Sequence, residues 1–209
     1  MKRFKPFLSN RAFLISIGIS LLLLFGSLFI NYAAGMYATE KASNSVTDII
    51  LNNIRVYDVD GIFIYGPLVF WFFVSIILIL DPGKIPFTIK SIALFIVIRS
   101  IFISLTHIGP FPVQIPLSSD NPLYGLIFDG DLFFSGHTGF PFLLTLLFWE
   151  NKKLRYLFLI TSVIFAIVVL LGHYHYSIDV LAAFFITYAI ADIARFLFKK
   201  DLEIFKNGL

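Results

Sequence analysis

Long apolar segments separated by short polar connections dominate the hydropathy pattern of this chain. Because a helix needs roughly 20 mostly apolar residues to cross a membrane, the pattern predicts six membrane-spanning helices. They are expected at about residues 12–33, 62–80, 87–108, 132–149, 154–171 and 177–198. Only connecting segments remain between them. We therefore predict an all-α fold in which residues 1–209 form a single polytopic membrane domain, with the six helices in one bundle.

The composition agrees with a membrane protein and excludes several other classes. Hydrophobic residues make up 58% of the 209 residues and charged residues 14%, with a mean hydropathy of +0.89. Soluble domains are only about 45–50% apolar and about 25% charged, so a soluble globule and a disordered chain are excluded. No cysteine is present, which excludes disulfides, thiolate metal ligands and a thiol nucleophile. We attribute the net charge of +3 to membrane topology and anionic lipid, not to nucleic acid.

The basic residues predict the orientation of the helices. The first apolar segment follows Lys2, Arg3 and Lys5, but it is longer than the core of a secretory signal, so we expect an uncleaved anchor. Thirteen of the 16 Lys and Arg residues fall at the termini and in alternate connections. Cytoplasmic segments carry such an excess, so both termini are expected in the cytoplasm. The segments expected on the other side are 34–61, 109–131 and 172–176.

Candidate reactive residues gather on that non-cytoplasmic side. His175 and Asp179 are four residues apart, so a helix would place them on one face. The carboxylate could then orient one imidazole nitrogen and leave the other free to attack or to take a proton. The alternative is an aspartate at a helix start beside an interfacial histidine, without chemical function. All four histidines of the chain are expected at this depth; they are His107, His137, His173 and His175.

Residues 134–141 read as the start of a helix. Ser135, Gly136 and His137 precede Pro141 and an apolar run, a pattern typical of a helix N-terminus. Free backbone N–H groups at a helix start suit an anionic phosphate, and His137 beside them is placed to act as an acid. The alternative is a simple helix entry with an interfacial histidine.

Arg99 is an unusual residue for a membrane span. It is expected about 13 Å below the outer end of the third span, where an unpaired arginine is unfavourable. Thr106 lies seven residues further on, above Arg99 and on nearly the same face. A phosphate is a natural partner for a guanidinium. The alternative is an internal ion pair with Asp131 or Asp179, and the two are compatible if substrate phosphate replaces that partner.

Together these residues suit phosphoryl transfer through a histidine. His175 would attack a phosphorus atom, Asp179 would orient it, and His137 would protonate the leaving oxygen. Arg99 and the backbone of residues 135–137 would hold the phosphoryl oxygens. This chemistry requires no cofactor and no metal. Three histidines and an aspartate are also a donor set for zinc, and spacing alone does not distinguish the two readings.

The motifs resemble those of a known superfamily. Ser135-Gly136-His137 and His175-x-x-x-Asp179 resemble the second and third motifs of the type 2 phosphatidic acid phosphatases. The longer strings at 130–138 and 173–180 are similar to blocks of the sphingomyelin synthases and their ceramide phosphoethanolamine synthase relatives. That resemblance implies six spans, a catalytic triad of His137, His175 and Asp179, and His175 as the nucleophile that carries the headgroup. The residues expected to bind the substrate phosphate are Arg99, Thr106, Asp131, Ser135 and Gly136.

Two departures from the phosphatase pattern favour the synthase branch. The first phosphatase motif, KxxxxxxRP, is absent, and Val169 stands where the third has its arginine. We therefore expect a sphingomyelin synthase-like enzyme of sphingolipid metabolism. It would move a phosphorylated headgroup from a phospholipid to the hydroxyl of ceramide or diacylglycerol. The alternatives are a lipid phosphate phosphatase with water as acceptor, and a non-enzymatic lipid-binding or transport protein.

Overall fold

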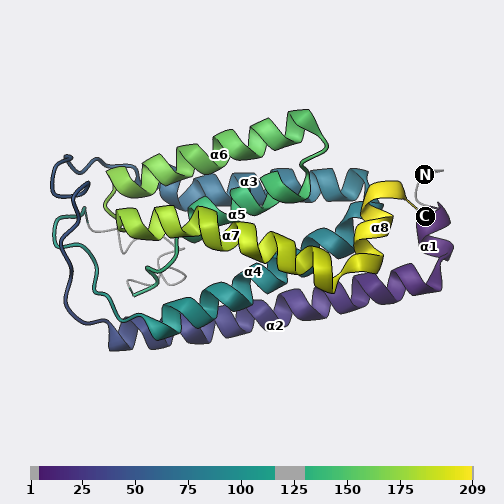
Figure 1. Ribbon diagram of the computed structural model, residues 1–209, viewed down its shortest axis with the longest axis horizontal. Coiled ribbons are helices and arrows are strands. Elements are labelled where there is room, and N and C mark those ends of the chain that lie inside the picture. The colour runs from purple at the N-terminus through teal and green to yellow at the C-terminus, as the bar shows by residue number, and fades with distance from the viewer. Residues whose placement is uncertain (1–4, 116–129, 209) are drawn as a thin grey trace.

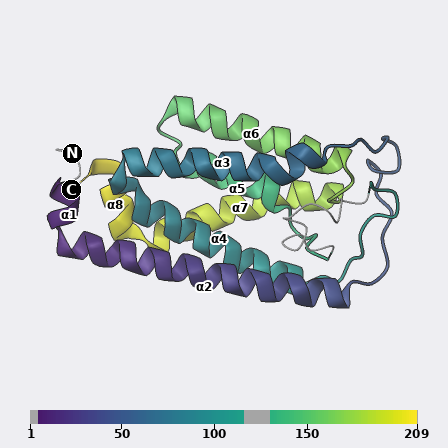
Figure 2. The ribbon, with the colours of Figure 1, turned by 180° about the vertical axis from the view of Figure 1, so that it is seen from behind.

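The computed structural model describes residues 5–115 and 130–208, and within these residues the regular structure is entirely helical. Five long helices run along one axis of a single bundle (Figure 1): α2 (Arg11–Lys41), α3 (Asp60–Leu80), α4 (Ile85–Leu105), α6 (Lys152–Leu171) and α7 (Ser177–Leu197). The shorter elements are α1 (Lys5–Ser9), the 3₁₀ turn η1 (Pro82–Lys84), α5 (Gly136–Leu147) and α8 (Lys199–Asn207). Both chain ends lie at one end of the bundle, and the connections 42–59 and 106–115 lie at the other (Figures 1 and 2).

Five helices of the described chain are long and apolar enough to cross a membrane, which fits an integral membrane protein. They correspond to five of the expected spans. The first is longer than the apolar pattern alone predicted, since α2 continues to Lys41. The third begins earlier, because η1 and Pro86 lead directly into α4 and together give a span of Pro82–Leu105.

The expected fourth span, residues 132–149, differs from the prediction. The helix found there is α5, which has 12 residues and is therefore about 18 Å long, short of the roughly 30 Å of a bilayer core. A helix beginning at residue 132 would use the carbonyl of Leu132 internally, but that oxygen accepts a hydrogen bond from His175. The helix begins only after Ser135, whose hydroxyl caps it by accepting from the amide of Thr138. A bundle of six spanning helices is thus not confirmed.

α5 forms the centre of the core. It packs against α6 and α7, and Leu143 and Leu144 are fully buried. The ring of Phe140 lies edge-to-face with Phe70 and stacks on Trp71, both from α3. The enclosed position of α5 places its first turn, and the residues before it, in the interior of the bundle.

The end of the bundle that carries the connections 42–59 and 106–115 is called the loop end. Side chains of Asp48 and Tyr176 join the connections there. Asp48 accepts hydrogen bonds from the amides of Ile50 and Leu51 and, at 2.7 Å, from the amide of Ser177 at the start of α7. Burial acts to raise the pKa of Asp48, but these backbone hydrogen bonds outweigh it and hold the pKa below its ordinary value. The Tyr176 hydroxyl donates to the Gly109 carbonyl, and burial raises the pKa of this tyrosine. The start of α7 is therefore fixed by two other segments.

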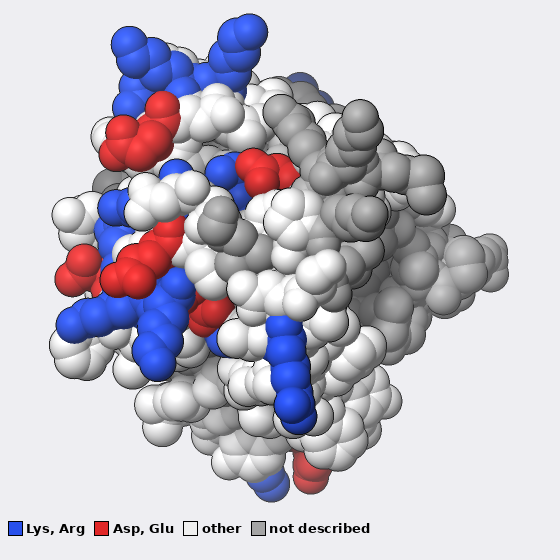
Figure 3. Space-filling view, turned by 90° about the vertical axis from the view of Figure 1, so that its right-hand side faces the viewer, with Lys and Arg blue, Asp and Glu red and all other residues white. Residues whose placement is uncertain are grey.

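The opposite end carries the chain termini and much of the basic charge (Figure 3). Exposed lysines there include Lys152, Lys199 and Lys206. Lys90 is different: it lies inside α4 and is buried, with Nζ 2.6 Å from the Asp201 carboxylate of α8. Lys90 Nζ also donates to the Ser16 hydroxyl of α2 at 2.8 Å. This cluster joins three helices at the end remote from the candidate site.

Candidate active site

Residues 130–135 connect α4 with α7 and form the framework of the site. Arg99 from α4 binds this segment through Asp131 and the Phe134 carbonyl. From α7, the Asp179 carbonyl accepts a hydrogen bond from the Ser135 amide at 3.2 Å. His175, just before α7, binds the Leu132 carbonyl. The segment thus brings together residues that are far apart in the sequence.

Arg99 is buried and makes several interactions. One guanidinium nitrogen lies 2.7 Å from Asp131 Oδ1, and another donates to Asp131 Oδ2 at 2.9 Å. Its Nε donates to the Phe134 carbonyl at 2.8 Å. The predicted internal ion pair of Arg99 is therefore present, and Asp131 is the partner. Since Asp131 is itself an anion, its contribution to a phosphate site would be to position Arg99 and not to contact the phosphate.

His175 and Asp179 lie on one face of the chain, as their spacing predicts. His175 Nδ1 is 3.5 Å from Asp179 Oδ2, but its hydrogen bond goes to the Leu132 carbonyl at 2.8 Å. A carbonyl can only accept, so Nδ1 carries the hydrogen, and Nε2 of the neutral imidazole has a free lone pair. Asp179 Oδ2 in turn accepts from the Tyr176 amide at 2.9 Å. Asp179 thereby caps α7 and places a buried negative charge beside the imidazole.

His137 stands in the first turn of α5 and is held by α3. Its Nε2 lies 3.1 Å from the Phe63 carbonyl, so Nε2 donates and Nδ1 is left for a substrate. The ring stacks on Phe63 with centroids 4.3 Å apart. Phe63 also packs against Tyr174, whose hydroxyl donates to Asp60 at the start of α3. Burial raises the pKa of Tyr174, so that hydroxyl stays protonated as the donor.

The first turn of α5 faces Arg99. A Cβ at Gly136 would lie 3.1 Å from Arg99 Nε, so a side chain at this position would press on the guanidinium. The Ser135 amide is occupied by the Asp179 carbonyl. The amides of Gly136 and His137, in contrast, have no intrahelical acceptor, because they open the helix. They are the backbone donors that remain for an anion beside Arg99.

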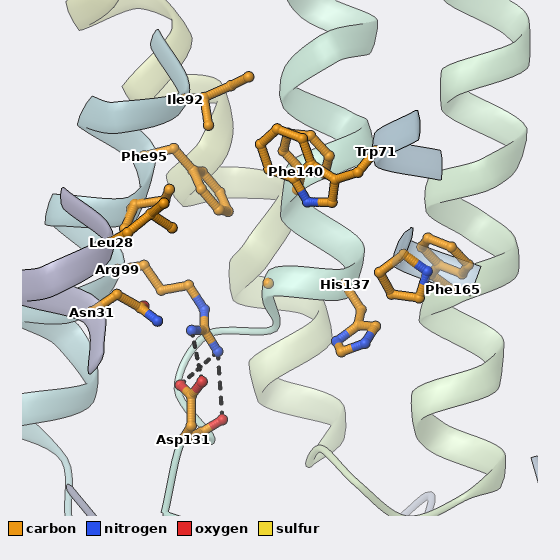
Figure 4. A pocket seen from close by; sticks show the side chains of 13 residues that line it. Leu28, Asn31, Trp71, Ile92, Phe95, Arg99, Asp131, His137, Phe140 and Phe165 are labelled. Carbon is orange, nitrogen blue, oxygen red and sulfur yellow. Dashed lines mark hydrogen bonds and ion pairs between the residues drawn. The ribbon is translucent and has the colours of Figure 1, made fainter. Parts of the chain in front are cut away.

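A cavity of about 250 Å³ lies beside Arg99 and the first turn of α5. Ser135, His175 and Asp179 do not line it. Its lining includes Gly136 and, at one end, Arg99, Asp131 and His137 (Figure 4); all four were among the predicted site residues. The rest of the lining is apolar apart from Asn31; it includes Leu28, Trp71, Ile92, Phe95 and Phe140. The cavity therefore combines a charged end with an apolar remainder.

Some predicted residues lie apart from this cavity. Thr106 caps α4, its hydroxyl donates to the Phe102 carbonyl at 3.1 Å, and it does not line the cavity. His107 packs against Tyr37, and His173 Nδ1 binds the Val113 carbonyl. Over residues 5–115 and 130–208, no three His, Asp or Glu side chains lie together so that they could hold a metal ion. The zinc alternative thus finds no ligand cluster in this part of the chain.

Sequence reasoning did not identify Phe63 or Asn31. Phe63 acts through its carbonyl and its ring, and one more phenylalanine in an apolar span carries no distinctive signal. Asn31 could have been found, since it is an amide within an apolar segment, and polar residues in spans are functional candidates by default.

The chain was then compared with known proteins. Residues 130–195 match the family model described as PAP2 superfamily C-terminal. No curated protein and no solved structure matches the chain. The matched region contains Ser135, His137, His175 and Asp179. It therefore supports the type 2 phosphatidic acid phosphatase superfamily, whose members are typically enzymes acting on phosphate esters.

Proposed function

We propose that this protein is a membrane enzyme that transfers a phosphorylated headgroup from a phospholipid to a lipid hydroxyl, in the manner of the sphingomyelin synthases. The acceptor is ceramide or diacylglycerol, and the reaction proceeds through a phosphohistidine. One observation carries the proposal: His175 Nδ1 donates to the Leu132 carbonyl, which leaves Nε2 as a free nucleophile. The same short segment that holds His175 also holds Arg99.

The reaction has two steps. In the first, His175 Nε2 attacks the phosphorus, an N–P bond forms, and the P–O bond to the donor glycerol breaks. His137 enters this step as the imidazolium, with hydrogen on both nitrogens: it gives the Nδ1 proton to the leaving oxygen and becomes neutral, while Nε2–H stays on the Phe63 carbonyl. In the second, the acceptor hydroxyl attacks the phosphorus, the N–P bond breaks, and the hydroxyl proton returns to His137 Nδ1.

The remaining residues stabilise charge during these steps. Asp179, 3.5 Å from His175 Nδ1, balances the positive charge that the imidazole gains when it is phosphorylated. Arg99 and the free amides of Gly136 and His137 hold the phosphoryl oxygens. The proposal requires no cofactor. With a lipid phosphomonoester as the donor and water as the acceptor, the same steps would release inorganic phosphate, and the protein would be a lipid phosphate phosphatase.

A product assay tests the proposal. The purified full-length protein is supplied with mixed phospholipids and with fluorescent ceramide and diacylglycerol as acceptors. Lipid products are separated by chromatography, and inorganic phosphate is measured in the same tube. We expect a new polar fluorescent lipid. Phosphate release without new lipid would replace the transferase by the phosphatase. Tight lipid binding without either product would favour a lipid-binding or transport protein.

The matched variant is His175→Asn. Its amide nitrogen can still donate to the Leu132 carbonyl in place of Nδ1, but it has no counterpart of Nε2. We expect turnover to fall by at least about 10³-fold, together with loss of the acid-labile phosphoryl label on the protein. His107→Asn is the control, because the His107 ring packs against Tyr37 and, unlike His175, does not bind the Leu132 carbonyl. A normal rate in His175→Asn would contradict the mechanism.

We also infer that the site lies on the non-cytoplasmic side and that both termini are cytoplasmic. The distribution of Lys and Arg supports this orientation. Because the chain has no cysteine, single cysteines can report sidedness. In intact cells, a membrane-impermeant maleimide should label Asn53→Cys, in the loop end, and should not label Lys206→Cys in α8. The reverse labelling pattern would place the site in the cytoplasm.

A further inference from the structure

Asn31 differs from the serines of the same apolar helix. The hydroxyl of Ser16 donates to Asp201, and those of Ser20 and Ser27 donate to carbonyls of their own helix. Asn31 forms no hydrogen bond within residues 5–115 and 130–208. An amide without a partner is unfavourable in the hydrocarbon region. A structural function is thus not visible for Asn31 in this part of the protein.

The side chain of Asn31 faces the cavity. It lines the wall together with Leu28, one turn earlier on α2, and with Arg99 of α4. Figure 4 shows its amide on the same side of the cavity as the guanidinium of Arg99. Asn31 therefore offers a donor and an acceptor close to the groups that would hold a phosphate.

The cavity has the chemistry of a lipid site. Arg99 and His137 form its charged end, and Ile92, Ile96 and Trp71 belong to its apolar part. Leu28 lines the cavity and is 46% exposed on the flank of the bundle, so the cavity extends to the surface that faces hydrocarbon chains. A lipid with its phosphate at Arg99 and its chain along the apolar part would place its ester, amide or hydroxyl oxygens between the two.

We propose that Asn31 is a substrate-binding residue, whose amide hydrogen-bonds such an oxygen at the junction of headgroup and hydrocarbon chain. The inference rests on the proposed function for its substrate, a lipid phosphate ester. The oxygen belongs to the donor phospholipid or to the acceptor lipid. The two sources are distinguished by which Michaelis constant changes.

The first test is kinetic and uses Asn31→Leu in the full-length protein. We expect kcat/KM to fall about three- to tenfold, the effect of one neutral hydrogen bond, mainly through a higher KM. A higher KM for the phospholipid assigns the oxygen to the donor, and a higher KM for ceramide or diacylglycerol assigns it to the acceptor. Asn31→Gln, which keeps the amide, should recover part of the loss.

The thermal stability of Asn31→Leu distinguishes a substrate-binding function of Asn31 from a structural one. Asn31→Leu removes no hydrogen bond of the described protein, so its thermal unfolding temperature should equal or exceed that of the parent. Ser27→Ala is the control on the same helix: it removes a hydroxyl that donates to the Leu24 carbonyl, and KM should not change. Unchanged kinetics in Asn31→Leu would overturn the inference while leaving the proposed function intact, and a lower unfolding temperature would assign Asn31 a structural function instead.

A binding experiment decides the inference even if no turnover is found. The His175→Asn variant is mixed with a phospholipid that carries a photoreactive diazirine in its acyl chain, and the labelled peptides are identified. We expect label at Leu28 and Ile96, and several-fold less label there when Asn31→Leu is added. Equal labelling with and without Asn31→Leu would overturn the inference. Absence of turnover by the parent protein would contradict only the proposed function.

Discussion

Arg99 and Asp131 form a two-point ion pair, with a shortest N–O distance of 2.7 Å, at the cavity that His137 also lines. Arg99 Nε also donates a hydrogen bond to the Phe134 carbonyl. The guanidinium is thus oriented by the segment that also holds His175. Because Asp131 already neutralises Arg99, a phosphate would have to share the guanidinium with Asp131 or displace it.

The geometry of Arg99 predicts that lysine cannot replace it. Lysine keeps the charge, but it cannot bind two oxygens of Asp131 and the Phe134 carbonyl in a fixed plane. We expect Arg99→Lys to lower kcat/KM by about 10²-fold, comparable with loss of one transition-state donor. The measurement is steady-state turnover of the purified variant. Arg195→Lys is the control, because Arg195 donates to the Leu146 carbonyl outside the cavity. Equal losses in both variants would argue against a specific function for Arg99.

Gly136 provides a second test of how Arg99 is placed. A methyl group there would meet Arg99 Nε at 3.1 Å and would displace the guanidinium by a few tenths of an ångström. We expect Gly136→Ala to lower kcat/KM about tenfold, since a misplacement of about 1 Å can cost about 10²-fold. Thermal stability should be unchanged or slightly higher, because alanine favours helix over glycine by up to about 1 kcal/mol.

The matched control is Gly61→Ala in α3, where an added methyl group meets nothing within 4 Å. Its activity should equal that of the parent. A normal rate in Gly136→Ala would mean that Arg99 moves freely, and the proposed clamp on the phosphoryl oxygens would then be wrong.

The sequence predicted those parts of the site that depend on residues close together in the chain. The spacing of His175 and Asp179 and the helix start at Ser135 are local features, and both are found. The acceptors bound by His175 and His137 were not predictable, because the carbonyls of Leu132 and Phe63 belong to distant segments and every residue type has a backbone carbonyl.

The short length of α5 escaped prediction for a related reason. Leu132, Phe133 and Phe134 are as apolar as the helix that follows, so hydropathy alone continues the helix through them. The Leu132 carbonyl accepts from His175 and the Phe134 carbonyl accepts from Arg99, and hydropathy does not report such bonds. The five remaining long helices were predicted well because their apolar runs end at polar or proline-containing turns.

Asp48 predicts a pH dependence of stability. Its pKa is held below its ordinary value of 3.8 in the folded protein. A carboxyl group with a lowered folded pKa stabilises the protein above the unfolded pKa, and this contribution is lost as the pH falls through the folded pKa. At pH 7 we therefore expect Asp48→Asn to lower the free energy of unfolding by about 1–3 kcal/mol, because charged hydrogen bonds to three amides are weakened.

The measurement is thermal unfolding in detergent at several pH values. The difference between Asp48→Asn and the parent should shrink as the pH falls below about 4, where the parent also becomes protonated. Asp192→Asn, whose carboxylate is 79% exposed, should show a much smaller difference at every pH. A constant difference for Asp48→Asn across the pH range would show that the charge of Asp48 does not contribute to stability.

Breaking the buried ion pair of Lys90 and Asp201 should lower the stability of the protein without lowering its turnover. Both side chains are only 10% exposed, and Lys90 precedes Arg99 by nine residues on α4, about 14 Å along the helix. Removing one partner leaves an uncompensated buried charge, so Lys90→Met should cost about 3–5 kcal/mol. The double variant Lys90→Met with Asp201→Leu should recover much of this loss, since apolar residues can replace a buried ion pair.

Turnover per folded molecule should stay at the parent level in both variants, measured at a temperature where each is folded. If kcat fell in the stable double variant, the Lys90–Asp201 ion pair would be coupled to the candidate active site.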